Sequence, residues 1–186
     1  MSERIVLIEA ASPGEVKSGG EGMRVEWGIA ESPFGLCSVG WNDRGICHLA
    51  FCDRASGLPE ELRGAWHGAA FFRNDRAAKT WIRKIFAGKS AERIPVFVRG
   101  TGFQLKVWRA LLRIPMGKVS SYSKIAAAIG NPSACRAVGT ACGANPVACL
   151  IPCHRVVHAS GTMSGYRWGA ERKRGMLAAE GAVLRK

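Results

Sequence analysis

The pattern of hydrophobic residues changes near residue 100, and this change limits the folds open to the chain. Between residues 24 and 51, the segments "RVEWGIAES", "LCSVGW" and "ICHLAF" are separated by the turns "PFG" and "NDRG", which is typical of strands. A helical spacing follows in "NDRAAKTWIRKIFAG", and "IPVFV" reads as another strand. We therefore predict an α/β N-terminal domain over residues 23–98, a small antiparallel sheet with a helix, preceded by a flexible arm over residues 1–22.

After residue 100 the hydrophobic spacing becomes that of helices. Three segments with this spacing follow one another, "TGFQLKVWRALLRIP", "SSYSKIAAAIG" and "NPSACRAVGTACGAN", and "GAERKRGMLAAEGA" closes the chain. The second and third are joined by a short Gly-Asn-Pro turn, which matches a helix-turn-helix. We predict a mostly α C-terminal domain over residues 99–186 that contains this motif.

The two halves of the chain differ sharply in charge. Residues 1–98 hold 13 Lys or Arg against 12 Asp or Glu, whereas residues 99–186 hold 14 Lys or Arg and only two acids, Glu171 and Glu180. Nearly all of the formal net charge of +13 therefore lies in the second half. Such a basic domain indicates a polyanion partner, most simply nucleic acid, with a solubilising basic surface as the alternative.

The composition favours a globular protein inside the cell. No apolar run approaches the roughly 18 residues of a membrane helix, and the N-terminus has no signal-peptide pattern. We therefore expect a cytoplasmic location without membrane association, and association with the nucleoid when the protein is bound to DNA. The chain has seven cysteines, and this odd number favours free thiols over a disulfide framework.

The segment "LIPCHRVV" places a cysteine between a proline and a histidine-arginine pair. A buried structural cysteine is one reading of Cys153. A zinc site is another, because Cys149, Cys153, His154 and His158 have the spacing C-x3-C-H-x3-H, although Pro152 stiffens the segment. The third reading is a reactive thiol whose pKa is lowered by the positive charges that follow it. An extended backbone would separate Cys153 from His154, so a bridging water is the expected link between them.

This region resembles the active site of the O6-alkylguanine-DNA alkyltransferases, the methylated-DNA–protein-cysteine methyltransferases. The resemblance rests on "IPCHRVV", preceded by "GNPSACRAVGTACGANPVACL" and followed by "SGTMSGYRWGAERKRGMLAAEG". It runs from Phe103 to Gly181 and is weaker over the first half. It implies a ribonuclease-H-like N-terminal domain and a winged-helix-like C-terminal domain. It also implies irreversible, single-turnover transfer of an alkyl group from O6-alkylguanine to cysteine, with O4-alkylthymine as a further candidate substrate.

The resemblance assigns five residues to the reaction. Cys153 is the acceptor, His154 acts through a water as its base, and Glu180 orients His154. Asn145 braces this array, although a turn-forming Asn before a proline has the same spacing. Tyr122 donates to N3 of the flipped guanine, although a tyrosine at a helix start can equally be a packing residue.

DNA contacts and the pocket wall follow from the same resemblance. Arg136 is the arginine finger that fills the space left by the flipped base, and the expected DNA-contacting residues beside it are Cys135, Ala137, Tyr122 and Ser123. The small residues around Arg136 favour a narrow minor groove over sequence reading in the major groove. The pocket residues are Val156, Tyr166, Arg167, Trp168 and Ala148. The carbonyls of Cys153 and Val156 are expected to face the guanine amino group. Ala148 widens the pocket and Trp168 narrows it, so the adduct size stays open.

Other functions remain as alternatives. A non-catalytic sensor of alkylated DNA is the main one, followed by a transcription regulator that uses the helix-turn-helix and, more weakly, a cysteine hydrolase. The zinc-binding positions of some members have no clear match at Cys37, Cys47, Cys52 or His48, so we expect no metal and no other cofactor. The expected partner is double-stranded DNA containing alkylated guanine, bound by a monomer.

Overall fold

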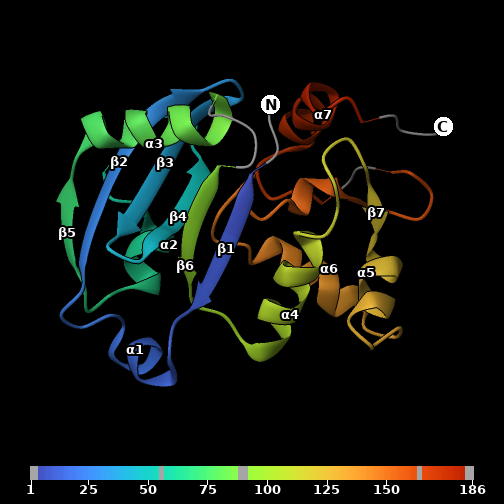
Figure 1. The fold of residues 1–186 in the computed structure, drawn as a ribbon, viewed down its shortest axis with the longest axis horizontal. Coiled ribbons are helices and arrows are strands. Elements are labelled where there is room, and N and C mark those ends of the chain that lie inside the picture. Colours follow the sequence, from blue (N-terminus) through green and yellow to red (C-terminus); the bar gives the residue numbers. More distant parts are fainter. Residues whose placement is uncertain (1–3, 55–56, 88–91, 163–164, 183–186) are drawn as a thin grey trace. The chain divides into compact units, whose positions relative to one another are not determined.

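The computed structural model describes residues 4–54, 57–87, 92–162 and 165–182 (Figure 1). The chain divides into two compact units, Ser2–Gly100 and Thr101–Lys186. This division falls two residues after the boundary that the sequence suggested. None of the helices in the described ranges has the length and hydropathy needed to cross a bilayer.

A six-stranded sheet forms the first unit. Its strands are β1 (Ile5–Ala10), β2 (Arg24–Ser32), β3 (Gly35–Asn42), β4 (Gly45–Phe51), β5 (Ala70–Arg73) and β6 (Arg93–Val98). Their order across the sheet is β1-β6-β4-β3-β2-β5. The antiparallel pairs among the described strands are β2 with β3 and β3 with β4, whereas β1 with β6, β4 with β6 and β2 with β5 run parallel. The predicted antiparallel sheet is therefore wrong for the outer strands. Parallel strands require long connections between them, and here the connections contain helices. Helix α2 (Glu60–Ala65) lies between β4 and β5, and α3 (Asp75–Ala87) lies between β5 and β6.

The predicted "NDRG" turn joins β3 to β4. Asn42 Oδ1 accepts hydrogen bonds from the backbone N–H groups of Arg44, at 2.9 Å, and Gly45, at 3.1 Å. Gly45 has a φ of 139°, and a Cβ at this position would lie 2.5 Å from the carbonyl oxygen of Pro95. The turn therefore requires glycine both for its backbone conformation and for its close approach to β6.

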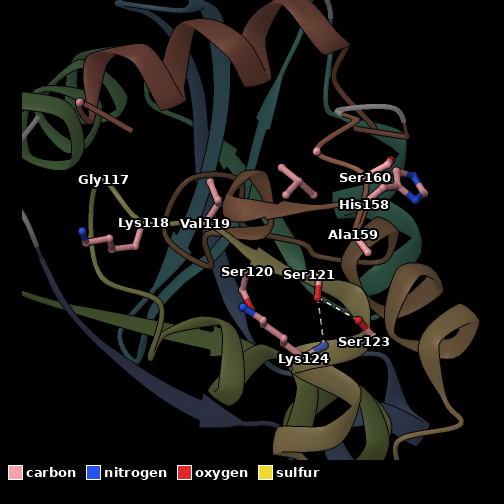
Figure 2. A pocket seen from close by; sticks show the side chains of 13 residues that line it. Gly117, Lys118, Val119, Ser120, Ser121, Ser123, Lys124, His158, Ala159 and Ser160 are labelled. Atoms are coloured by element: carbon pink, nitrogen blue, oxygen red, sulfur yellow. Dashed lines mark hydrogen bonds between the residues drawn. The ribbon is translucent and has the colours of Figure 1, made fainter. Parts of the chain in front are cut away.

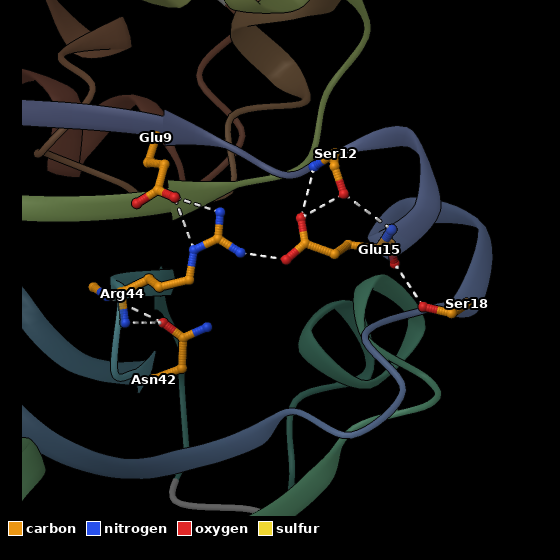
Figure 3. A network of polar contacts seen from close by, with 7 residues as sticks. Glu9, Ser12, Glu15, Ser18, Asn42 and Arg44 are labelled. Carbon is orange, nitrogen blue, oxygen red and sulfur yellow. Dashed lines mark hydrogen bonds and ion pairs between the residues drawn. The ribbon is translucent and has the colours of Figure 1, made fainter.

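Residues 5–18 are ordered elements, so the prediction of a flexible arm over residues 1–22 is wrong there. β1 pairs with β6 along its whole length, and α1 (Pro13–Ser18) begins with a capping box between Ser12 and Glu15. The guanidinium of Arg44 bridges the carboxylates of Glu9 and Glu15 (Figure 3). It also lies 3.9 Å from the centre of the Phe97 ring. These contacts join the N-terminal segment to the β3–β4 turn and to β6.

The second unit is helical. Its elements are α4 (Gly102–Leu111), β7 (Ser120–Ser121), α5 (Tyr122–Ala128), α6 (Cys135–Gly143), the 3-10 helix η1 (Cys153–Arg155), β8 (Val156–Val157) and α7 (Ala170–Ala179). A capping box between Thr101 and Gln104 starts α4, and the Ser121 hydroxyl caps α5. Helices α4, α5 and α6 pack on one another, and β7 pairs with β8 in parallel. An α/β first unit followed by a helical second unit confirms the predicted fold class at this level.

Candidate active site

The backbone bends at Cys153, which begins the single turn of η1. Pro152 precedes the turn, and the backbone N–H of Val156 closes it by donating to the carbonyl of Cys153. The run before Cys153 therefore does not continue as the extended segment that its sequence suggested. Only 5% of the Cys153 surface is exposed, so the thiol lies inside the helical unit.

Asn145 holds the sulfur in place. Its Nδ2 donates to Cys153 Sγ at 3.2 Å and to the carbonyl of Ile151 at 2.8 Å, and its Oδ1 accepts from the backbone N–H of Val147 at 3.0 Å. The side chain is completely buried. Asn145 therefore joins the turn after α6 to the segment that carries the thiol, and this positioning is far more specific than a turn-forming role alone.

His154 lies on the same turn and contacts the end of α7. Its Nε2 is 2.9 Å from Glu180 Oε1, and neither side chain is accessible to solvent. Arg155 makes a bidentate contact with the same carboxylate, with Nε and Nη2 each 2.9 Å from a Glu180 oxygen, while its Nη1 donates to the carbonyl of Ile114 at 2.7 Å. Glu180 thus receives hydrogen bonds from two side chains of η1.

The electrostatics of this cluster fix its protonation states. Burial disfavours a charged Glu180, but hydrogen bonds from His154 and Arg155 outweigh it and lower the pKa of Glu180 to about 2. Burial also lowers the pKa of His154, against the opposing effect of Glu180. At neutral pH Glu180 is therefore an anion that only accepts hydrogen bonds. His154 Nε2 must then carry the proton, which leaves Nδ1 as the basic nitrogen.

The Cys153 thiol is protonated at neutral pH. Burial raises its pKa to about 11, although the Asn145 hydrogen bond and the charges of Lys173 and Arg167 oppose this rise. The sequence-based expectation of a lowered pKa is therefore wrong for the resting protein, because desolvation outweighs the neighbouring charges. A base must remove the proton for the sulfur to act as a nucleophile.

Lys173 is a site residue that the sequence analysis missed. Its side chain is 1% exposed, and Nζ donates to the Val156 carbonyl at 2.6 Å. The signal was its spacing on α7, where Lys173, Met176, Leu177 and Glu180 lie on one buried helical face. In the sequence this lysine is hidden within the basic run "ERKRG".

The predicted DNA-contacting residues lie at the starts of α5 and α6. Cys135, Arg136 and Ala137 are exposed in the first turn of α6, and Ser123 is exposed in the first turn of α5. Tyr122 is half-buried, with its ring 5.3 Å from that of His158 and about 4 Å from a Cβ built on Gly139 of α6. Burial raises the pKa of Tyr122, so its hydroxyl is a proton donor at neutral pH.

The predicted pocket residues differ in exposure. Val156 and Ala148 are fully buried, Trp168 is 9% exposed, and Arg167 is on the surface. The Tyr166 and Trp168 rings meet edge to face at 5.4 Å, and the Tyr166 hydroxyl donates to Met176 Sδ at 3.7 Å. Tyr166 and Trp168 therefore pack on each other and, through Met176, on α7, whereas Ala148 belongs to the core.

A groove of about 910 Å³ lies beside β7 and β8 (Figure 2). We call it the basic groove and define it by residues 117–121, 123–124, 157–161 and 181. Lys118, Lys124 and His158 line it together with serines, and no acidic side chain is among its lining residues. Ser121 Oγ is 2.9 Å from Ser123 Oγ and accepts from the backbone N–H of Lys124 at 3.2 Å. Its chemistry suits an anion such as a phosphodiester.

The zinc spacing of the sequence, C-x3-C-H-x3-H, involves Cys149, Cys153, His154 and His158. Within the described ranges, no group of three or more His, Cys, Asp or Glu residues is placed to hold a metal ion. His154 is bonded to Glu180, and His158 is exposed against Tyr122.

The chain is similar in sequence to known methylated-DNA–protein-cysteine methyltransferases. The family "6-O-methylguanine DNA methyltransferase, DNA binding domain" matches residues 102–182. The chain is 40% identical over 160 residues to the methylated-DNA–protein-cysteine methyltransferase of Mycolicibacterium paratuberculosis, covering 84% of this chain and 92% of that protein. It is also 40% identical over 170 residues to the bifunctional transcriptional activator/DNA repair enzyme Ada of Escherichia coli, covering 89% of this chain but only 48% of Ada. The chain thus spans about half the length of that relative.

A solved structure of a relative has a similar fold over most of the chain. The crystal structure of Mycobacterium tuberculosis OGT in complex with DNA matches with a TM-score of 0.69 and 35% sequence identity, covering 84% of this chain and 92% of that one. This coverage exceeds the length of the C-terminal unit, so the similarity also includes most of the first unit.

Proposed function

The chain belongs to the methylated-DNA–protein-cysteine methyltransferase family, and from this premise we propose that it repairs O6-alkylguanine in DNA by moving the alkyl group to Cys153. One observation carries the proposal. The buried thiol of Cys153 accepts a hydrogen bond from Asn145, and the next residue, His154, is bonded to Glu180. This arrangement supplies a nucleophile, a positioning donor and an oriented base.

The first step is removal of the thiol proton. Because Glu180 fixes the proton of His154 on Nε2, Nδ1 is available as the base, and this atom is buried without a hydrogen-bond partner among the described residues. We expect a water to carry the proton from Cys153 Sγ to Nδ1, as the resemblance implies. The imidazolium that forms is stabilised by the Glu180 carboxylate.

The second step is displacement at the alkyl carbon. The thiolate forms a sulfur–carbon bond while the bond from that carbon to O6 breaks, and the guanine ring takes the electron pair. The Tyr122 hydroxyl stabilises the leaving purine by donating to N3. The thioether product has no ionisable proton and no good leaving group, so each molecule acts once.

DNA binding is assigned to the α5–α6 pair. Their exposed first turns, separated by the turn of residues 129–134, fit a helix-turn-helix, and Arg136 projects from the surface that would enter the minor groove. Arg136 takes the place of the flipped guanine, while Cys135, Ala137 and Ser123 contact the backbone. The basic groove would follow the phosphates beside the lesion.

Two finer features of the fold belong to the same proposal. The antiparallel β2–β3–β4 strands with parallel neighbours and covering helices fit a ribonuclease-H-like first unit. Helices α4, α5 and α6, followed by the short β7–β8 pair, fit a winged-helix-like second unit. We expect the protein to act as a monomer in the cytoplasm.

The test is a reaction with a duplex that carries one O6-methylguanine, followed by intact mass and peptide mapping. We expect a single methyl group on Cys153 with one-to-one stoichiometry. The matched control is the Cys142→Ser variant, which lacks another buried thiol of the same unit and should react normally. Tight binding without a mass gain would identify a non-catalytic lesion sensor instead, and a methyl group on another cysteine would show that the acceptor is wrong.

A further inference from the structure

We propose that His158 is a positioning residue for this reaction, whose imidazole ring holds the ring of Tyr122 so that the phenol hydroxyl is already in place when a base enters the site. The inference rests on the proposed function and deepens it, because the resemblance assigned no role to this histidine.

The short β7–β8 pair brings the two side chains together. Its parallel register pairs Ser121 with Val157, and Tyr122 and His158 are the residues that follow them. Because parallel strands run in the same direction, the next residue of one strand lies beside the next residue of the other. Strand β8 also carries Val156, whose carbonyl is expected to face the guanine, so one short strand serves both the pocket and Tyr122.

Two elements contact the Tyr122 ring. The centre of the His158 ring lies 5.3 Å from its centre, with an angle of 56° between the ring planes, which is within the range of favourable aromatic pairs. On α6, a Cβ built on Gly139 would lie 3.9 Å from the Tyr122 ring. The ring is thus held from the end of β8 and from α6, and the loss of either contact would leave it more freedom.

A turn fixes the backbone of His158, although the residue is exposed. Its N–H donates to the carbonyl of Thr162 at 3.0 Å, and its carbonyl accepts from the N–H of Gly161 at 2.9 Å. Gly161 has a φ of 82°, a left-handed conformation that glycine adopts without strain. Such a turn needs no aromatic side chain at its first residue, so the imidazole ring requires another explanation.

The Tyr122 hydroxyl lies near the reacting sulfur. Burial raises the pKa of Tyr122, and the thiols of Cys142, Cys153 and Cys135 raise it further. The hydroxyl therefore keeps its proton at neutral pH, within electrostatic range of the Cys153 sulfur. A proton donor in this position can stabilise the negative charge that develops on the purine as the bond to O6 breaks.

Such a donor is most effective when it is preorganised. A tyrosine that rotates about its side-chain torsions must lose that freedom in the transition state, which slows the reaction. The contact with His158 removes part of this freedom beforehand. We therefore expect the rate to depend on the imidazole ring more than the stability does, since substitutions of exposed residues have small effects on stability.

A phosphate contact is the competing role for His158. The residue lines the basic groove (Figure 2), where an imidazole that contacted the DNA backbone would have no effect on Tyr122. The two roles differ in what they predict for the free base O6-methylguanine, which has no phosphate but retains N3. A positioning role affects both the duplex and the free base, whereas a phosphate contact affects the duplex alone.

The experiment compares three replacements of His158 with a control histidine. His158→Ala and His158→Gln remove the ring, whereas His158→Phe retains one. His67→Ala is the control, because His67 is an exposed histidine of the first unit. Single-turnover methyl transfer to Cys153 is measured with a saturating concentration of duplex and with the free base, and the His158→Ala change is also made in a Tyr122→Phe background.

We expect His158→Ala and His158→Gln to transfer methyl about tenfold more slowly from both substrates, because part of the effect of a preorganised donor is lost. On the free base, the rate of His158→Phe should be closer to the wild type than to His158→Ala, and His67→Ala should match the wild type. In the Tyr122→Phe background, replacing His158 by Ala should have no further effect, since the hydroxyl that it positions is absent.

The contact itself is tested without DNA. The chain has two tyrosines, Tyr122 and Tyr166, so the protein labelled with 3-fluorotyrosine gives two fluorine resonances, which Tyr166→Phe assigns. We expect His158→Ala to shift the Tyr122 resonance, because the ring current of the imidazole is lost. His67→Ala should leave this resonance in place.

An unshifted Tyr122 resonance in His158→Ala would overturn the inference. So would a loss of rate on the duplex alone, or a loss that persists undiminished in the Tyr122→Phe background, because each would show that His158 acts independently of Tyr122. If one of the ring-free variants does not fold, the other carries the test. A wild-type protein that takes methyl from neither substrate refutes the proposed function, and the fluorine comparison then still decides whether His158 holds Tyr122.

Discussion

Replacing Glu180 by Gln should destabilise the helical unit strongly at neutral pH. The carboxylate accepts three hydrogen bonds of 2.9 Å, one from His154 and two from Arg155, with its side chain fully buried. Gln offers one acceptor oxygen and turns an NH2 group toward a donor, so Arg155 loses its anion inside the protein. Breaking a buried pair in this way typically costs about 3–5 kcal/mol.

The lowered pKa of Glu180 gives a second estimate of the stability that its carboxylate contributes. Its fall from the ordinary value of 4.5 to about 2 corresponds to about 3 kcal/mol of stability in the ionised state. Because the folded pKa is the lower one, this contribution is complete above pH 4.5 and is lost as the pH falls toward 2. The lowered pKa of His154 acts in the same direction, since protonation of the unfolded chain below pH 6.5 favours unfolding.

The assay is urea unfolding followed by pulse labelling of Cys142 and peptide mapping. Cys142 is buried in the same unit, so its labelling reports on this unit. At pH 7 the urea midpoint of Glu180→Gln should fall by about 1.5 M for a loss of about 3 kcal/mol. The difference from the wild type should shrink as the pH is lowered from 4.5 toward 2.

Glu171→Gln is the matched control, because it makes the same chemical change on α7 where the carboxylate is 89% exposed. Its midpoint should move by no more than a few tenths of a molar, since exposed pairs contribute about 0–1 kcal/mol. Equal midpoints for Glu180→Gln and the wild type at pH 7 would refute the reasoning, and so would a difference that stays constant down to pH 2.

Three further predictions concern the reaction and DNA. Asn145→Ser removes the donor to Cys153 Sγ and should slow single-turnover methyl transfer about tenfold, by raising the thiol pKa further; an unchanged rate contradicts the positioning role. Arg136→Ala should slow repair of a duplex at least about tenfold while leaving reaction with the free base O6-methylguanine unchanged; equal losses on both substrates would exclude a finger. Replacing Lys118 and Lys124 together by Gln should reduce the slope of log affinity against log salt by about 2; an unchanged slope would show that DNA avoids the basic groove.

Each of these changes has its own control. The thermal midpoint of Asn145→Ser separates lost positioning from lost folding. For Arg136→Ala the free base serves this purpose, because it requires no flipping. For the salt slope the control is Lys79→Gln, since Lys79 is an exposed residue of the first unit.

The site was easier to anticipate from the sequence than the sheet. Cys153, His154 and Glu180 were singled out by their resemblance to a family motif. In the structure Asn145 is bonded to Cys153, and His154 is bonded to Glu180. Hydrophobic periodicity reports which residues are buried, but it does not say which strands pair or in which direction. For this reason the parallel β1–β6 pairing, and with it the order of residues 5–18, could not be anticipated.

Two features of the site escaped prediction for energetic reasons. The pKa of Cys153 depends on two opposing effects, burial and the neighbouring positive charges. The sequence shows the charged residues beside Cys153, but it does not show how completely the thiol is buried. Lys173 escaped because a lysine in a basic run is ordinarily solvated, and only packing of the α7 face on η1 shows otherwise.

The burial and the raised pKa of Cys153 also bear on how readily the thiol reacts with small molecules. If each molecule transfers a single alkyl group, as we propose, a molecule whose sulfur first reacts with a peroxide or a soluble electrophile is lost for repair. Such reagents attack exposed thiolates, and at neutral pH this sulfur is neither exposed nor ionised. Burial should therefore protect the sulfur from these reagents until alkylated DNA binds, as the proposed function requires.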